Sequence, residues 1–281
     1  MNDYQVSVTA GLAYAEVDGR VLLADLYRPA TQEPPPVVVF VHGGGWAVGS
    51  RSDFAETRLA PLAAHGVAVL SIDYRLVDVA HFPAQLHDVK AAVRWLRASA
   101  RDLDVDAEHM GIWGASAGAV LASLVGLTAG QPELEGSVGD EHAHSSAVQA
   151  VVAWFGLSDL SATTTRSPLE AQLLPPGPEA GFLGVVSLAE VPDVRDLARQ
   201  ASPVTWVSEA APPFLIAHGD RDRMVAPSES RALHDALVRV GAHSSLLVVG
   251  GAGHEDPAFD SSASLALTAG FLLGTFRSVA R

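Results

Sequence analysis

The sequence predicts an α/β fold: a mostly parallel central sheet, helices on both faces and an antiparallel hairpin at one edge. Three observations support this. Short apolar runs alternate with helical segments over most of the chain, which is typical of crossover connections between parallel strands. A tight-turn signal joins two apolar-rich runs near the N-terminus. The 281 residues, 48% of them hydrophobic, suffice for one large domain with a sizeable core.

The N-terminal hairpin is expected over residues 12–17 and 21–27, joined by Asp18-Gly19, because this dipeptide tolerates the positive φ of a tight turn. Further strands are predicted from β-branched and apolar runs typical of buried parallel strands: 37–41, 67–72, 110–113, 148–155, 214–217 and 246–249. Apolar residues at helical spacing predict helices over 84–98, from 117 onward, over 231–240 and over 264–276.

The alternation of strands and helices stops between residues 156 and 202. Prolines there interrupt short apolar pieces such as Leu173-Leu174 and Phe182-Leu183. We interpret residues 156–202 as a small cap-like excursion within a single domain of residues 1–281.

Composition excludes several classes of function. The chain has 18 Lys+Arg against 32 Asp+Glu, a net charge of −14, which argues against nucleic acid or anionic membrane as a partner. The absence of cysteine excludes disulfides, thiolate metal sites and a cysteine nucleophile. The first ten residues lack the basic and apolar regions of a signal peptide, so we expect a cytoplasmic location. The uncharged stretch 110–132 contains five glycines and is interpreted as buried core, not as a membrane span.

The segment 114–118 reads Gly-Ala-Ser-Ala-Gly and matches G-x-S-x-G between a predicted strand and a predicted helix. This is the context of a nucleophile elbow, in which a sharp turn lifts the serine hydroxyl clear of the sheet. Ser116 is therefore the candidate nucleophile. The alternative is that Ser116 merely caps the N-terminus of a Gly- and Ala-rich helix.

His42-Gly43-Gly44-Gly45 directly follows the predicted strand 37–41. Consecutive glycines let several backbone N–H groups point into one space, as in an oxyanion hole or a phosphate cradle. No Lys-Ser or Lys-Thr follows, which disfavours a P-loop. In G-x-S-x-G enzymes such a loop acts together with the N–H of the residue after the serine, here Ala117.

A serine nucleophile needs a base, which in these enzymes follows the serine in the chain. The candidates are the histidines in the late part of the chain: His218, His234, His243 and His254. His254 follows the strand 246–249 through the glycine-rich loop 250–253, which can carry an imidazole to the sheet edge. His218 ends a strand and is better suited to a buried or loop-supporting role.

The acid that orients the base is expected after the strand 214–217. Asp220 and Asp222 both lie there, and Asp159 follows another strand. Asp222 is further out, where the loop can turn toward His254, whereas Asp220 is suited to cap the turn or pair with an arginine. Loop position thus favours Asp222.

Together these motifs resemble the α/β-hydrolase fold, specifically the H-G-G-G group of esterases and lipases related to hormone-sensitive lipase and ferulate esterases. The resemblance runs from about residue 24 to residue 254 and includes the segments 24–29, 71–76, 82–84 and 218–225. The family pattern H-G-x-x-D-x-x-V coincides with residues 218–225, which supports Asp222 as the acid.

The resemblance also implies residue roles. The second and third glycines of the H-G-G-G loop, Gly44 and Gly45, would donate to the oxyanion together with Ala117. A charge and hydrogen-bond network behind the elbow is implied for three further residues: Tyr74, Arg75 and Asp88. The segment 73–79 departs from the D-Y-R-L-A-P-E of hormone-sensitive-lipase relatives and, with the short N-terminal region, favours the shorter and more open members.

The predicted function is a serine carboxylesterase that hydrolyses small, short-acyl or aromatic esters through an acyl-enzyme. An amidase or formamidase with the same triad is the alternative, and a non-catalytic ligand-binding member of the fold is a third. Trp46 is expected to border the substrate pocket or to be a core residue. We expect no metal or organic cofactor, and we interpret His142 and His144 as solvated surface residues. The small-molecule ester is the expected partner, and a homo-oligomer is left open.

Overall fold

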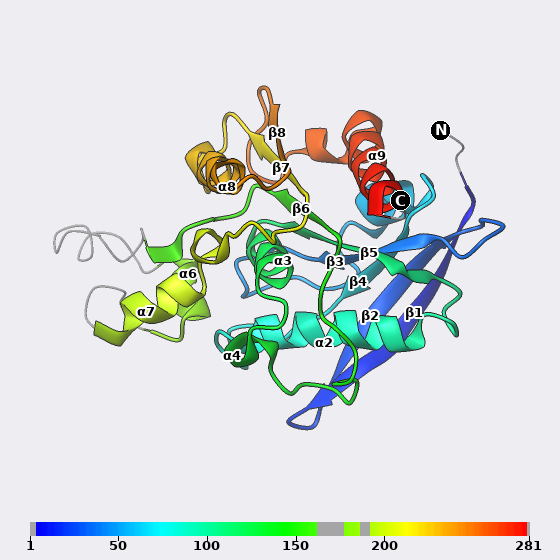
Figure 1. The fold of residues 1–281 in the computed structure, drawn as a ribbon, viewed down its shortest axis with the longest axis horizontal. Helices are drawn as coiled ribbons and strands as arrows, with labels where there is room; N and C mark the ends of the chain where they lie inside the picture. The colour runs from blue at the N-terminus through cyan, green and yellow to red at the C-terminus, as the bar shows by residue number, and fades with distance from the viewer. Residues whose placement is uncertain (1–3, 162–176, 186–191, 280–281) are drawn as a thin grey trace.

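The computed structural model describes residues 4–161, 177–185 and 192–279. Eight strands form one sheet in the order β1-β2-β4-β3-β5-β6-β7-β8, which Figure 1 shows with the β1–β2 hairpin at one edge and β8 at the other. The strands are β1 (Val6–Val17), β2 (Arg20–Pro29), β3 (Pro36–Val41), β4 (Ala68–Ile72), β5 (Asp106–Ala115), β6 (Ala150–Trp154), β7 (Phe214–Gly219) and β8 (Ser244–Val249). β1, β2 and β4 pair antiparallel, and the pairs from β4 to β8 are parallel. The predicted α/β class and edge hairpin are confirmed.

The N-terminal hairpin is longer than the sequence predicts. β1 begins at Val6, six residues before the expected start, and pairs with β2 through a register shift between Thr9 and Leu12. Gly11 lies in that irregularity with φ of 73°, and its N–H donates to Asp25 Oδ1 at 2.8 Å. The glycine interrupts the apolar alternation, which explains why the earlier half of the strand was missed.

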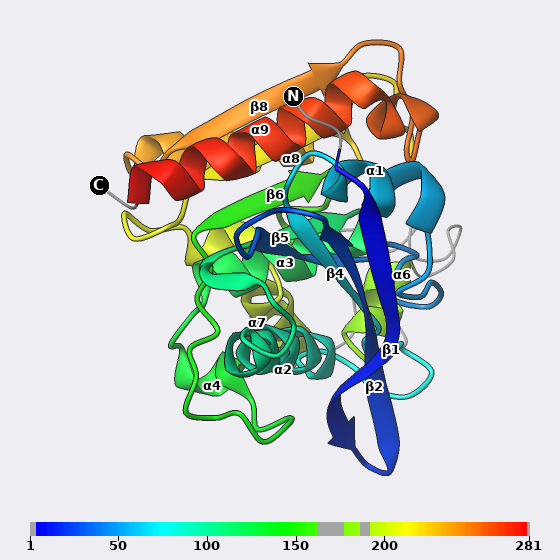
Figure 2. The same ribbon diagram turned by 90° about the vertical axis from the view of Figure 1, so that its right-hand side faces the viewer.

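Helices cover both faces of the sheet. They are α1 (Ala60–Ala63), α2 (Ala84–Ser99), α3 (Ala117–Leu127), α4 (Pro132–Glu135), α6 (Pro178–Phe182), α7 (Pro192–Gln200), α8 (Pro227–Arg239) and α9 (Ser262–Val279). The described residues also form short helical segments, among them η1 (Ala55–Leu59), η3 (Pro203–Trp206) and η4 (Pro257–Asp260). Figure 2 shows α9 and α2 on opposite sides of the sheet.

The strand β3 illustrates how the two layers of core form. Val37, Val39 and Val41 belong to the cluster that includes α2 and α3. Val38 and Phe40 point the other way and pack with α1 and α9. Since side chains alternate along a strand, a strand buried on both faces needs an unbroken apolar run, and this one has it.

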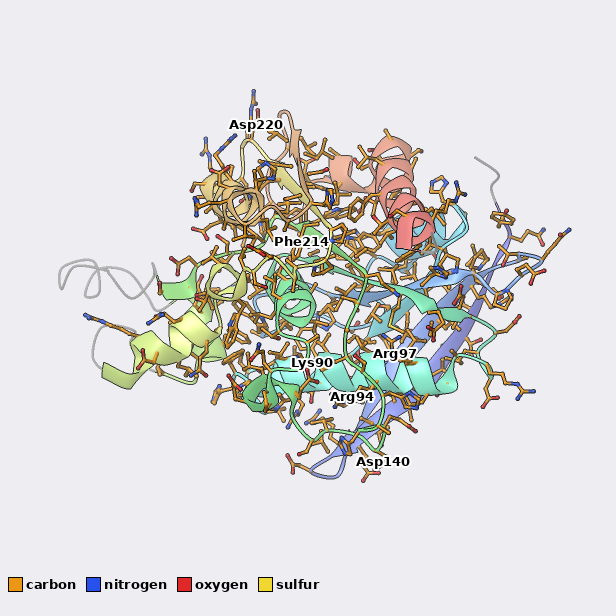
Figure 3. The ribbon with its side chains drawn as sticks, viewed as in Figure 1. Lys90, Arg94, Arg97, Asp140, Phe214 and Asp220 are labelled. Atoms are coloured by element: carbon orange, nitrogen blue, oxygen red, sulfur yellow. The ribbon has the colours of Figure 1, made fainter. Side chains whose placement is uncertain are left out.

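The helix α2 holds the far end of α3. Lys90, which is fully buried, donates from Nζ to the carbonyl of Thr128 at 2.7 Å and pairs with Glu135 at 2.8 Å. Thr128 is the C-terminal cap of α3, and the negative end of the helix dipole there stabilises a nearby cation. Arg94 donates to the Val138 carbonyl at 3.0 Å, and Figure 3 shows Lys90, Arg94 and Arg97 following one another along α2. This anchors the helix whose N-terminus follows Ser116.

The segment predicted as a cap is described in part. Leu173 and Leu174 lie outside the described residues. Phe182 and Leu183 are buried in the core cluster that includes α2 and α3. The predicted buried stretch 110–132 forms the end of β5, α3 and the start of α4. In the described ranges, no helix has both the length and the apolar character needed to cross a bilayer.

Candidate active site

Ser116 lies in the sharp turn between β5 and α3. Its backbone has φ 53° and ψ −120°, and its N–H donates to the Trp154 carbonyl at 2.9 Å. It holds the N-cap position of α3, but its side chain makes no capping hydrogen bond. Instead, Ser116 Oγ lies 2.8 Å from His254 Nε2. The strained conformation and this contact disfavour a simple capping role.

The small residues around Ser116 have a steric reason. A Cβ on Gly118 would lie 2.1 Å from the Val41 carbonyl oxygen, and one on Gly114 would lie 2.1 Å from the Gly118 carbonyl oxygen. No side chain fits at either distance. The two glycines let the start of α3 pack directly against the end of β3, which brings Ser116 next to the loop that follows β3.

His254 and Asp222 continue the chain of hydrogen bonds. His254 Nδ1 lies 2.7 Å from Asp222 Oδ2, and the Asp222 side chain is fully buried. The other oxygen, Oδ1, accepts the N–H groups of Met224 at 2.8 Å and Val225 at 3.0 Å. Burial works to raise the pKa of Asp222, but the hydrogen bonds from His254 and these amides outweigh it and hold the pKa below its usual value. Asp222 is therefore an anion that orients the imidazole.

The other two candidate acids are used elsewhere. Asp220 is exposed and accepts the N–H of Gly251 at 2.6 Å, as a turn cap; Figure 3 places it at the outer end of the molecule. Asp159 accepts the N–H of Ser161 at 2.8 Å. Within the described residues, Asp222 is the one of the three that contacts His254.

A second histidine contacts the same carboxylate. His218, at the end of β7 and 1% exposed, has Nε2 at 3.1 Å from Asp222 Oδ2. Its Nδ1 lies 2.6 Å from Ser230 Oγ on α8. Burial lowers the pKa of His218, so the ring is neutral near pH 7. The sequence analysis expected a buried, loop-supporting residue here but not this contact; the four-residue spacing to Asp222 was the available signal.

The loop after β3 is shaped by positive φ angles. Gly44 has φ 100° and Gly45 has φ 60°, and a Cβ on Gly44 would lie 2.2 Å from the Val48 carbonyl oxygen. His42 supports the loop from inside: its Nδ1 lies 2.8 Å from the Gly43 carbonyl. Burial lowers the pKa of His42 and keeps the ring neutral, so Nδ1–H is the donor to that carbonyl.

The three residues of the implied network fall into two groups. The Tyr74 ring stacks on His42 with centroids 4.3 Å apart, and its hydroxyl donates to the His42 carbonyl at 3.0 Å. Arg75 instead binds Asp88 of α2 through Nη2 at 2.7 Å and through Nε at 2.9 Å. Tyr74 thus braces the glycine loop, whereas Arg75 and Asp88 anchor the segment after β4 to α2.

Ser116 and His254 line a pocket with a mostly apolar wall. Its other lining residues are Gly45, Trp46, Ala117, Val120, Leu157, Pro178, Glu179, Met224 and Val225. Gly45 and Ala117, two of the predicted oxyanion donors, are among them, and Gly44 is the residue before. Trp46 is 1% exposed, so it both lines the pocket and packs in the core. Glu179 contributes a carboxyl group to the wall.

An ion-pair cluster behind His254 was not predicted. Glu255 has φ 50°, and its carboxylate lies 2.9 Å from Nη2 of Arg58, a fully buried residue of η1. Arg58 Nε also contacts Asp260 at 2.6 Å. The pair connects positions 197 residues apart, and no local pattern in the sequence signals it. Among the described residues no group of three or more His, Asp or Glu could hold a metal ion.

The chain is similar in sequence to known esterases. The BD-FAE family model matches residues 24–237. Esterase LipC of Mycobacterium tuberculosis H37Rv is 34% identical over 84% of this chain and 57% of its own length. Esterase LipQ of the same strain is 34% identical over 80% of this chain and 51% of its own length. The chain therefore spans about half the length of these curated relatives.

Two solved structures of similar fold are described as esterases. A truncated form of a carbohydrate esterase from gut microbiota superposes with a TM-score of 0.85 at 29% identity, covering 99% of each chain. The propionate-bound thermophilic esterase Est2 from Thermogutta terrifontis gives a TM-score of 0.75 at 26% identity, covering 96% of this chain and 94% of its own. The fold of this protein is the α/β-hydrolase fold.

Proposed function

The chain belongs to the BD-FAE family, and from this starting point we propose that it is a serine carboxylesterase that hydrolyses small carboxylic esters through an acyl-enzyme. One observation carries the proposal: Ser116, His254 and Asp222 form a continuous hydrogen-bonded chain at the wall of a pocket. This arrangement supports nucleophilic catalysis by an activated serine. The names of the relatives support ester hydrolysis as the reaction.

In the first half-reaction, His254 Nε2 takes the proton of Ser116 Oγ as the oxygen attacks the ester carbonyl carbon. The carbonyl oxygen becomes negative and is stabilised by backbone N–H groups of Gly44, Gly45 and Ala117. The start of α3 directs the N-terminal dipole of that helix toward the same charge. Asp222 stabilises the imidazolium of His254 without taking its proton.

The tetrahedral intermediate then collapses. His254 returns the proton to the leaving alcohol oxygen, and the acyl group stays on Ser116. In the second half-reaction, His254 takes a proton from water, the hydroxide oxygen attacks the acyl carbon, and the proton goes to Ser116 Oγ as the carboxylic acid leaves.

The pocket supports small, short-acyl or aromatic esters as substrates. Val120, Leu157 and Val225 offer apolar contacts near Ser116. A relative of the same fold holds propionate in its solved structure, which supports a short acyl chain. A cytoplasmic location, a possible homo-oligomer and the absence of nucleic-acid partners stay predictions from the sequence.

The test is covalent labelling with a fluorophosphonate, run beside hydrolysis of p-nitrophenyl esters of increasing acyl length. We expect labelling of the wild type and loss of both labelling and hydrolysis in Ser116→Ala. Ser123→Ala, which changes another serine of α3, is the matched control and should keep both. Hydrolysis that survives Ser116→Ala would contradict the proposal. Faster cleavage of an anilide or an N-formyl substrate than of the esters would favour an amidase.

A further inference from the structure

Asp222 Oδ2 lies between two imidazoles. His254 Nδ1 is 2.7 Å away on one side and His218 Nε2 is 3.1 Å away on the other. We propose that His218 is a positioning residue, which donates its Nε2–H to Asp222 and thereby sets both the orientation and the effective charge of the carboxylate that faces His254. The inference rests on the proposed serine-hydrolase function and goes beyond it.

The surroundings of His218 determine which ring nitrogen carries the proton. Nε2 faces two acceptors, Asp222 Oδ2 and the Val225 carbonyl at 3.0 Å, so this nitrogen must be the donor. Nδ1 lies 2.6 Å from Ser230 Oγ. In a neutral ring Nδ1 is then the acceptor, and the Ser230 hydroxyl donates to it. Ser230, itself 2% exposed, therefore selects the tautomer that can donate to Asp222.

The result is a carboxylate with four donors. Oδ1 takes two amide N–H groups and Oδ2 takes two imidazole N–H groups. Such a carboxylate cannot rotate without breaking several charge-assisted hydrogen bonds. The imidazole plane of His254, and with it the approach of Nε2 to Ser116 Oγ, is held in place.

The second imidazole also affects charge. A hydrogen bond from His218 withdraws part of the negative charge of Asp222 from His254. Without this donor the carboxylate attracts the imidazolium form of His254 more strongly. A base that is protonated cannot accept the Ser116 proton, so the acid limb of the pH–activity profile should move to higher pH.

Other titratable groups around the site are left unchanged by a His218 substitution. On the loop of His254 these are Glu255, paired with Arg58, and Asp256, which accepts the Gly253 N–H at 3.2 Å. From the facing elements, Glu179 of α6 lines the same pocket, and Asp222 is the direct partner. His42 lies buried under the glycine loop.

The experiment compares His218→Phe, which keeps a ring but removes the donor, with His218→Gln, whose side-chain amide can still donate to Asp222. We measure kcat and KM for a p-nitrophenyl ester from pH 5 to 9 and check folding by thermal unfolding. His218→Phe should lower kcat by about tenfold, the loss expected for one hydrogen bond to a charged group, and move the acid limb upward by about half a pH unit. KM should change little, because His218 does not line the pocket. His218→Gln should restore most of the wild-type profile.

Two further variants complete the test. Ser230→Ala should move the acid limb in the same direction by a smaller amount, because without the Ser230 hydroxyl the proton of His218 is no longer held on Nε2. His234→Phe is the matched control: His234 makes a similar contact to a serine, from Nδ1 to Ser244 Oγ at 2.9 Å, and its loss should leave the profile unchanged.

The inference is overturned if folded His218→Phe keeps the wild-type kcat and acid limb. It is also overturned if His218→Phe loses activity while its acid limb stays unmoved, and His218→Gln does not restore that activity. If His218→Phe does not fold, an unmoved acid limb in Ser230→Ala overturns it. Failure of the proposed function would give different results. Either the wild-type protein would not be labelled by the fluorophosphonate, or the Ser116→Ala variant would keep its activity.

Discussion

Trp46 and Phe182 stack face to face, with ring centroids 4.2 Å apart and planes inclined by 10°. This contact joins the glycine loop after β3 to α6. Phe82 meets the other side of the cluster, edge-to-face with Phe182 at 5.4 Å, and its N–H donates to the Phe182 carbonyl at 2.8 Å. Because α6 carries Pro178 and Glu179, both in the pocket wall, the aromatic stack sets how far that wall lies from Ser116.

Truncation of this stack should affect stability and activity together. Phe182 is fully buried, so Phe182→Ala should lower the free energy of unfolding by about 3 kcal/mol. It should also lower kcat/KM, because α6 loses its anchor on Trp46. Phe182→Leu, which keeps most of the volume, is the control. Urea unfolding and ester kinetics check both effects, and an unchanged kcat/KM in Phe182→Ala would contradict the role of the stack.

Glu179 should discriminate between substrates by charge. Its carboxyl group lines the otherwise mostly apolar pocket, so an ester whose acyl or alcohol part carries a carboxylate should be hydrolysed more slowly than its neutral analogue. Glu179→Gln should reduce that difference by roughly fivefold, as for a partly exposed charge pair, and more at low salt than at high salt. Kinetics with a matched pair of succinyl and butyryl esters measure it. Equal ratios in wild type and Glu179→Gln would rule the effect out.

Gly44 should tolerate no side chain. Its φ of 100° and a Cβ position 2.2 Å from the Val48 carbonyl oxygen force the loop to move in Gly44→Ala. The backbone donors of the loop would then miss the oxyanion, and kcat should fall by about a hundredfold or more. Gly253→Ala is the control, since a Cβ there meets no atom within 4 Å. Near wild-type kcat in a folded Gly44→Ala would refute the assignment of the loop.

Stability should decrease as the pH falls from about 7.5 to 5.5. Burial is the largest cause that lowers the pKa of His42, His87 and His218 in the folded protein. The unfolded chain, with histidine pKa near 6.5, then binds more protons in this range, so acid favours unfolding by up to about 1.4 kcal/mol per pH unit for each histidine. Urea unfolding at several pH values gives the slope. His87→Gln should reduce it and the exposed His243→Gln should not; equal slopes in both variants would refute the explanation.

The Arg58–Glu255 pair should hold the loop that carries His254. Glu255→Gln removes one charge beside a fully buried guanidinium and should lower both stability and kcat, the former by about 1–3 kcal/mol. Arg58→Met combined with Glu255→Gln should cost less than the sum of the single changes, because the buried guanidinium that loses a partner in Glu255→Gln is absent from the double variant. A double-mutant cycle of unfolding free energies measures the coupling. Strict additivity would mean that the pair does not act as a unit.

Much of the fold followed from local patterns. Strand β3 and helix α2 were predicted to within a residue or two because their apolar patterns are recognisable from neighbouring residues in the chain. The start of β1 was missed because its residues are largely exposed and it is interrupted by Gly11. The short helices α6 and α7 were not foreseen, since each begins at a proline and the prolines of this stretch were interpreted only as interruptions.

The sequence by itself identified the candidate positions of a nucleophile, a base and a glycine loop. Each depends on residues within a few positions of one another, such as Gly114 and Gly118 around Ser116. Tertiary structure decided which acid reaches His254, which histidine shares Asp222, and which arginine holds Glu255. Those choices depend on how loops from separate strands turn at one edge of the sheet, and the residues involved are between 4 and 197 positions apart. A hydrogen bond requires its donor and acceptor to lie within a few ångströms of each other, and local sequence patterns determine such distances only between residues that are close in the chain.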